Sequence, residues 1–156
     1  MPKHTCCFIG NRHLPVKSIQ RILLNLDREI EHCISNGVST FICGGALGFD
    51  QIAASFIIAK KGLGKKIRLI FVLPCKNQDR LWNMKEREFY KDLLNEADNI
   101  IYITENTSHP FISKQNRYII EQSSYCICAL QSEKSETIQI IQYAKEKGLR
   151  IDNIAE

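Results

Sequence analysis

The segment from Gly44 to Asp50 reads Gly-Gly-Ala-Leu-Gly-Phe-Asp and lies between two strongly apolar stretches. Glycines in a strand-to-helix turn leave backbone N–H groups open to a phosphate, with the positive end of the helix dipole behind them. The segment is neither the dinucleotide fingerprint nor a P-loop, because its glycine spacing differs and no Lys-Ser pair follows. The sequence therefore predicts a ligand-binding turn formed by Gly44, Gly45 and Gly48. Asp50 either binds a ribose hydroxyl or stabilises the first helical turn, and both alternatives stay open.

A second candidate element, formed by Gly10, Asn11 and Arg12, follows the first apolar run. Glycine permits close approach of the backbone to a ligand. The guanidinium of Arg12 offers forked donors that suit phosphate or carboxylate. These features predict an anion site in this loop. The alternative is an ordinary loop whose arginine is solvated.

A third candidate element contains Pro74, Gln78 and Trp82 and follows the third apolar run. Trp82 can stack on a nucleobase, although packing in the core is the simpler use of an aromatic side chain. Cys75 lies beside Lys76, and a thiolate nucleophile needs such an electropositive neighbour. A covalent mechanism also needs a base. Since no histidine is identified for that role, covalent catalysis is disfavoured and no catalytic residue is assigned.

The last helical pattern opens with Ser135, Glu136 and Thr137. The two hydroxyl side chains, Ser135 and Thr137, are candidates to cap the helix and to line the ligand site. The carboxylate of Glu136 would repel a phosphate at this position.

Charge and cysteine content limit the class of protein. The formal net charge is +4, from 21 basic and 17 acidic residues, and the densest basic cluster, residues 60–68, indicates a solvated turn. This dispersed charge argues against nucleic acid as a partner. The seven cysteines show no zinc-site spacing, so no metal or other cofactor is expected. No signal peptide or membrane-length apolar run is found, which predicts a reducing, cytoplasmic location away from membranes.

Apolar segments alternate between strand-like and helix-like patterns along the whole chain. The expected strands are residues 5–9, 39–43, 67–73, 100–103, 125–130 and 150–154. The expected helices are residues 16–34, 49–57, 82–97, 108–122 (with Pro110 in its first turn) and 137–147. Near-continuous apolar strands are typical of a parallel sheet covered on both faces. The sequence therefore predicts one α/β domain over residues 1–156, with a Rossmann-like, doubly wound, mainly parallel sheet.

In an open parallel sheet, ligands bind in the crevice beyond the carboxyl ends of the strands. The candidate elements described above follow the strands in this way. The fold class therefore predicts that they meet at one edge of the sheet.

Together these segments resemble the YpsA-like branch of the SLOG superfamily. The resemblance rests on the stretch from Cys6 to Arg12, the GGALGFD segment, the Leu-Pro-Cys turn with Gln78 and Trp82, and the Asn116-Arg117-Tyr118 triplet. The superfamily groups bacterial and other Rossmann-like domains related to the cytokinin-activating LOG enzymes and to DprA/Smf proteins. The resemblance implies a pocket for a nucleotide derivative, with Asn116 and Arg117 reaching it from the fourth crossover.

The chain also departs from these relatives. They present a Gly-Gly-Thr turn before the last helix, where this chain has Ser135, Glu136 and Thr137. LOG enzymes carry a proline-glycine-glycine turn followed by a catalytic glutamate, which this chain lacks. A regulatory or sensing module for a nucleotide-derived small molecule is therefore favoured. One alternative is a LOG-like phosphoribohydrolase that uses Asp50, Glu133 or Glu136 to activate water. The other is a protein-interaction module with a vestigial pocket, and a homo-oligomer or another protein remains open as the partner.

Overall fold

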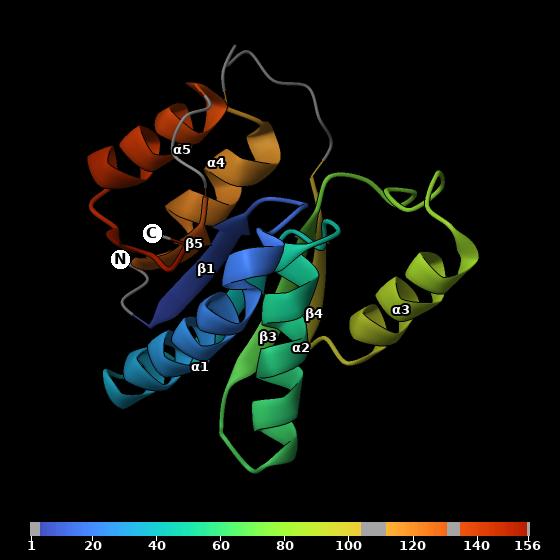
Figure 1. Cartoon of the computed structure of the whole chain (residues 1–156), viewed down its shortest axis with the longest axis horizontal. Helices are drawn as coiled ribbons and strands as arrows, with labels where there is room; N and C mark the ends of the chain where they lie inside the picture. Colours follow the sequence, from blue (N-terminus) through green and yellow to red (C-terminus); the bar gives the residue numbers. More distant parts are fainter. Residues whose placement is uncertain (1–3, 104–111, 131–134, 156) are drawn as a thin grey trace.

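The computed structural model describes residues 4–103, 112–130 and 135–155. Within these ranges, strands and helices alternate as the apolar pattern predicts (Figure 1). The strands are β1 (Thr5–Gly10), β2 (Thr40–Cys43), β3 (Arg68–Leu73), β4 (Asn99–Tyr102), β5 (Tyr125–Ala129) and β6 (Arg150–Asn153). The helices are α1 (Ile19–Ser35), α2 (Phe49–Gly62), α3 (Met84–Asn95), α4 (Lys114–Glu121) and α5 (Ser135–Glu146), and a short 3-10 helix (Val16–Ser18) precedes α1.

The six strands form one sheet in the order β4-β3-β2-β1-β5-β6, and every neighbouring pair is parallel. In the central strand β1, Cys7 pairs with Ile42 of β2 on one side and with Cys126 of β5 on the other. The chain builds outward from β1 to β4 and then returns to the other side of β1. This order confirms the doubly wound, Rossmann-like α/β fold and places its switch point between β1 and β5.

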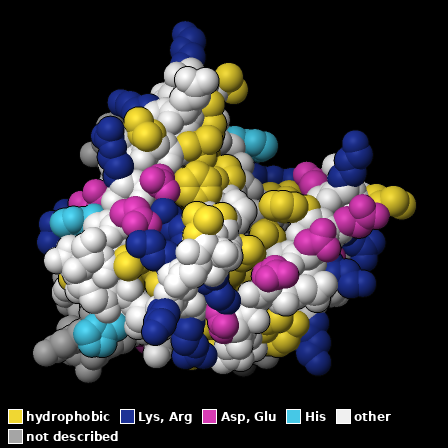
Figure 2. Space-filling view, turned by 90° about the horizontal axis from the view of Figure 1, so that it is seen from below, with side chains coloured by type: hydrophobic (Ala, Val, Ile, Leu, Met, Phe, Trp, Pro, Cys, Tyr) yellow, Lys and Arg dark blue, Asp and Glu magenta, His cyan; other side chains and the backbone are white. Residues whose placement is uncertain are grey.

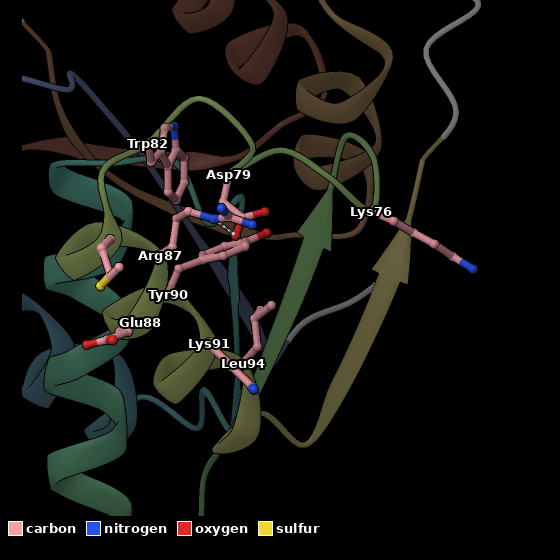
Figure 3. Close-up of a pocket in the computed structure, with 9 residues that line it drawn as sticks. Lys76, Asp79, Trp82, Arg87, Glu88, Tyr90, Lys91 and Leu94 are labelled. Atoms are coloured by element: carbon pink, nitrogen blue, oxygen red, sulfur yellow. Dashed lines mark hydrogen bonds and ion pairs between the residues drawn. The ribbon is translucent and has the colours of Figure 1, made fainter.

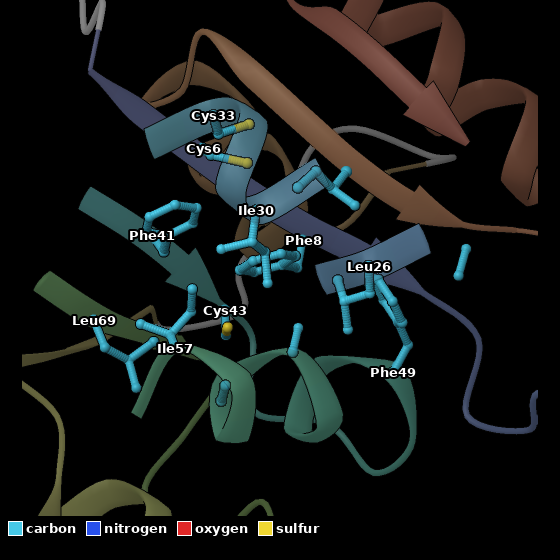
Figure 4. Close-up of a cluster of buried hydrophobic side chains, with 14 of the residues drawn as sticks. Cys6, Phe8, Leu26, Ile30, Cys33, Phe41, Cys43, Phe49, Ile57 and Leu69 are labelled. Carbon is cyan, nitrogen blue, oxygen red and sulfur yellow. The ribbon is translucent and has the colours of Figure 1, made fainter. Parts of the chain in front are cut away.

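Helices cover both faces of the sheet (Figure 1). Successive side chains of a strand point to opposite faces, so a strand that is apolar throughout presents apolar side chains on both faces, and helices bury them. Phe8 of β1 points toward α1 and α2, where its ring stacks on Phe41 at 5.8 Å and meets Phe49 edge-on at 6.2 Å (Figure 4). The next residue, Ile9, belongs to the cluster on the opposite face and packs with Ile119 of α4. The two layers therefore meet the same strand from opposite sides.

The fourth crossover helix starts later than the sequence pattern predicts. Helix α4 begins at Lys114 and not at Ser108, because Ser113 is extended (φ −61°, ψ 153°) and caps it. The Ser113 hydroxyl accepts a hydrogen bond from the Asn116 backbone N–H at 3.0 Å. Pro110 lies outside the described residues.

Six of the seven cysteines are buried. They are Cys6, Cys7, Cys33, Cys43, Cys126 and Cys128, while Cys75 is exposed. Burial raises the pKa of the Cys43 thiol well above its ordinary value. A thiol held neutral in this way packs as a small apolar side chain.

The basic cluster at residues 60–68 includes lysines that are paired with acidic side chains. Lys60 Nζ lies 2.7 Å from Asp27 Oδ1 and 2.7 Å from Glu31 Oε2, and Lys61 Nζ lies 2.5 Å from Asp98 Oδ2. Figure 2 shows basic and acidic side chains interspersed on this face. The cluster is therefore a surface ion-pair network, which stabilises the fold weakly.

Candidate functional site

A cavity of about 260 Å³ lies where β1 and β5 end, at the switch point of the sheet. We call it the switch-point cavity. Of the residues proposed from sequence, it brings together Gly10, Asn11, Asp50, Asn116 and Thr137. The rest of its wall is formed by Phe8, Ile9, Ala46, Gln115, Ile119, Leu130, Glu136 and Ile140. Helix α2 contributes from one layer and α4 and α5 from the other, so the cavity lies on the boundary between the two halves of the fold.

Two glycines allow the start of α2 to pack against the loop after β1. At Gly48, where φ is +94°, a Cβ would lie 2.1 Å from the Arg12 carbonyl oxygen. At Gly10, a Cβ would lie 2.3 Å from a ring carbon of Phe49. The Phe49 backbone N–H also donates to the Asn11 carbonyl at 3.2 Å. Close chain packing therefore explains both glycines without a ligand.

Amide side chains fix the carbonyl groups of the glycine-rich turn. Gln115 Nε2 donates to the Gly44 carbonyl at 3.1 Å and to the Val72 carbonyl at 2.9 Å, so one α4 side chain joins the ends of β2 and β3. Gln51 Nε2 donates to the Gly45 carbonyl at 3.1 Å. Gln115 was not selected from the sequence. Its only signal is its place beside Asn116, in the first turn of a serine-capped helix.

Asp50 holds a carboxyl group at the cavity with one oxygen unmatched. Its Oδ1 atom is buried and has no hydrogen-bond partner among the described residues. Burial raises the pKa of Asp50 from its ordinary 3.8 to about 7, although a hydrogen bond from the Ala46 backbone opposes the shift. Both protonation states are therefore populated near neutral pH. Such a group can accept or donate a proton, or a hydrogen bond, to a molecule in the cavity.

Several residues proposed from sequence lie away from the cavity wall. The Arg12 side chain is exposed, and neither Arg12, Arg117 nor Pro74 lines the cavity. Gly44, Gly45 and Gly48 form the adjoining turn, from which Ala46 reaches the wall. Ser135 is the first residue of α5, and the ligand roles proposed for all these positions stay predictions.

Trp82 lines a second, larger hollow of about 590 Å³ beside α3, which we call the α3 hollow (Figure 3), whereas Gln78 lies outside its wall. Trp82 precedes α3, although the sequence pattern predicts it inside the helix, because Asn83 caps the helix with a capping box. Its ring meets that of Tyr90 edge-on at 5.0 Å. Gln78 Nε2 donates to the Tyr90 hydroxyl at 3.0 Å and to the Gly44 carbonyl at 3.5 Å. These bonds connect the α3 hollow to the glycine-rich turn.

The charged side chains around the α3 hollow are of both signs. Its cationic residues are Lys76, Arg87 and Lys91, and its acidic residues are Asp79 and Glu88. Arg87 Nε lies 3.4 Å from Asp79 Oδ2 (Figure 3). The hollow therefore combines aromatic side chains with a mixed polar border.

No group of three or more His, Cys, Asp or Glu side chains among the described residues is placed to hold a metal ion. None of the helices within the described ranges has the length and apolar character to cross a membrane.

Two solved structures have the same fold over 96% of this chain. DNA processing protein A (DprA) from Helicobacter pylori matches with a TM-score of 0.60 and 22% identity, and DprA from Streptococcus pneumoniae with 0.61 and 16%. The chain spans 64% and 49% of the lengths of those two proteins. At these identities the likeness establishes the fold alone.

The structural similarity corrects one sequence-based expectation. The Helicobacter pylori protein is described with a single-stranded DNA binding mode. The inference that dispersed charge argues against nucleic acid as a partner is therefore wrong, because a protein with this fold binds it. Net charge averages over the whole surface, whereas contacts with phosphates require only a local group of cations.

Sequence relatives identify the family. The SPbeta prophage-derived protein YoqJ of Bacillus subtilis (strain 168) is 32% identical in an alignment 121 residues long, which covers 70% of this chain and 71% of that protein. A UPF0398 protein of Bacillus cereus (strain B4264) is 26% identical in an alignment 141 residues long, which covers 88% of this chain and 75% of that protein. The sequence model of the YspA SLOG family (YpsA) matches residues 8–154. The resemblance noted in the sequence is thus confirmed, and the chain belongs to the YspA SLOG family.

Proposed function

We propose that the chain is a binding module for a nucleotide-derived small molecule, which it holds in the switch-point cavity as part of a sensing or regulatory role. One observation carries the proposal: a cavity at the switch point whose wall includes a buried carboxyl oxygen that has no hydrogen-bond partner among the described residues. In doubly wound folds this crevice is the usual ligand position.

The chemistry of the wall supports a ligand with both donors and acceptors. An unmatched buried polar atom costs free energy, so its presence is best explained by a partner that is absent from the free protein. The amide groups of Asn11 and Asn116 lie at the same cavity and can each donate and accept hydrogen bonds. This combination suits the polar edges of a base and the hydroxyls of a sugar.

Alanine substitutions of the wall amides test this proposal. Each of Asn11→Ala and Asn116→Ala should weaken binding of the best ligand from a panel of nucleosides and nucleotides by about 1 kcal/mol, since each removes a hydrogen bond. Calorimetry measures the affinities. Asn95→Ala, an exposed asparagine at the end of α3, is the matched control and should bind as the parent does.

Two results would contradict the binding-module proposal. The first is that no nucleoside or nucleotide changes the melting temperature or gives heat on binding. The second is release of free base, seen by chromatography of the same samples and lost in Asp50→Asn. That release would establish the hydrolase alternative, with Asp50 as its acid–base group.

A second candidate function, binding of single-stranded DNA, is favoured by the α3 hollow. Proteins that bind single strands combine aromatic platforms with cationic grooves. The α3 hollow places Trp82 and Tyr90 beside Arg87 (Figure 3). Lys76 and Lys91 lie at its border, and the Lys76 ammonium lies 5.9 Å from the centre of the Tyr102 ring. The similarity of fold to the Helicobacter pylori DprA supports testing this surface.

Substitution of Trp82 tests the DNA proposal. Trp82→Ala should weaken binding of a labelled single-stranded oligonucleotide by about 1–3 kcal/mol, the contribution of one stacked base. Trp82→Phe retains an aromatic face and should lose much less. Fluorescence anisotropy at low and moderate salt measures both variants, and melting temperatures check that loss of the Tyr90 contact leaves the fold intact. Absence of binding by the parent at low salt, or equal binding by parent and Trp82→Ala, would exclude this surface.

A further inference from the structure

The wall of the switch-point cavity has an unusual balance of charge for a nucleotide site. Among the described residues that line it, two are acidic, Asp50 and Glu136, and none is Lys, Arg or His. Three carry amide side chains, Asn11, Gln115 and Asn116. The nearest arginine in the loop after β1, Arg12, is exposed and lies outside the wall. The described part of the cavity therefore offers hydrogen bonds without positive charge.

Two of the three helices that start at this cavity, α2 and α5, have an acidic side chain of the protein in the first turn. A helix N-terminus attracts a phosphate because its N–H groups are unmatched and its dipole is positive there. At α2, the Asp50 carboxyl lies in the first turn, and the Phe49 backbone N–H donates to the Asn11 carbonyl at 3.2 Å. At α5, Glu136 lies in the first turn and lines the cavity. An acidic side chain therefore lies beside two of the three helix N-termini at the cavity. At the third, α4, the first turn has no acidic residue, and the Ser113 hydroxyl accepts the hydrogen bond of the Asn116 backbone N–H.

The cavity is also small. At about 260 Å³ it lies just below the roughly 300–1,000 Å³ of typical pockets for drug-sized ligands. A base with its sugar is closer to this size than a dinucleotide or a nucleoside triphosphate.

We infer that the switch-point cavity selects an uncharged nucleoside and discriminates against its 5′-phosphorylated forms. The inference rests on the proposed function and specifies its ligand class. Asp50 Oδ1 accepts a hydrogen bond from a ligand hydroxyl or amino group, and the side chains of Asn11 and Asn116 match the remaining polar edges. Glu136 supplies the discrimination, because its carboxylate repels a phosphate dianion at the start of α5.

Calorimetry with each common nucleoside and its 5′-monophosphate tests the inference on the full chain. The best nucleoside should bind about tenfold more tightly than its monophosphate, as expected for like charges at the cavity mouth. Glu136→Gln should lower the ratio of nucleoside affinity to monophosphate affinity, because the monophosphate should bind more tightly to this variant. Glu96→Gln, which removes the same charge from an exposed position at the end of α3, should leave the ratio unchanged.

The possible failures are distinguishable. A monophosphate that binds as tightly as its nucleoside, or more tightly, would overturn the inference while leaving the proposed function in place. If the ratio of the two affinities is the same in Glu136→Gln as in the parent, the Glu136 carboxylate does not discriminate against the phosphate. If neither class of molecule binds, both the proposed function and the inference are wrong.

Discussion

Replacing Asp50 with asparagine should make the protein more stable than the parent at pH 8, by about 4 kcal/mol in the free energy of unfolding. The carboxyl has a pKa of about 7 in the folded protein, against its ordinary 3.8. Between these two pH values the folded state holds a proton that the unfolded state loses. The stabilising contribution of Asp50 is therefore complete below about pH 4 and is lost as the pH rises through 7. Asparagine does not ionise, so the stability of the variant does not fall in this way as the pH rises.

Urea unfolding of parent and variant at several values between pH 4 and pH 8 measures this difference. The two proteins should be nearly equally stable at the acidic end and should diverge as the pH rises. Asp98→Asn is the control with the opposite sign, because Lys61 and the Leu69 backbone N–H lower the pKa of Asp98. That variant should be less stable than the parent throughout this range, and it should recover relative to the parent only below about pH 4, where acid protonates Asp98. Parallel pH profiles for the parent and Asp50→Asn would show that Asp50 does not titrate as described.

Replacing Gly48 with alanine should lower the free energy of unfolding by roughly 4 kcal/mol, the sum of backbone strain and overpacking. The new Cβ would lie 2.1 Å from the Arg12 carbonyl oxygen, a backbone atom that cannot rotate away. The backbone angle of +94° adds strain of its own. Relief would require the start of α2 to move away from the loop after β1, which also opens the switch-point cavity.

Gly64→Ala separates the two contributions to this effect. Gly64 has nearly the same backbone angle, φ +97°, but an added Cβ would meet nothing within 4 Å. It should lose only about 1–2 kcal/mol, the cost of a left-handed alanine. Chemical denaturation of both variants gives the comparison. Equal losses at the two positions would mean that the contact with Arg12 is unimportant.

The fold was largely predictable from the sequence because its strands are buried on both faces. Segments such as the stretch from Thr5 to Ile9 are continuous apolar runs, and each is separated from the next by a helical pattern. The start of α4 was harder to place. Ser108 and Ser113 are both residues that commonly cap helices, and only the observed bond from Asn116 identifies Ser113 as the cap.

The candidate site was predictable in position but not in composition. The rule for strand ends identified Gly10, Asn11 and Asp50, because topology fixes where those ends meet. The rule does not reveal side-chain direction, so Trp82 was grouped with them although it lies at the α3 hollow. The raised pKa of Asp50 is equally invisible in a sequence, since it depends on how many atoms of other segments surround the carboxyl.

The position of the switch-point cavity between the two layers has a mechanical consequence. Helix α2 belongs to the half of the fold built from β1 to β4, whereas α5 belongs to the half that ends with β6. Such halves can open as separate cooperative units in a native protein. A ligand bound between α2 and α5 would stabilise the closed state of both halves, because neither half could open without releasing the ligand. Ligand binding in the switch-point cavity would then slow local opening at distant positions on both sides of the sheet.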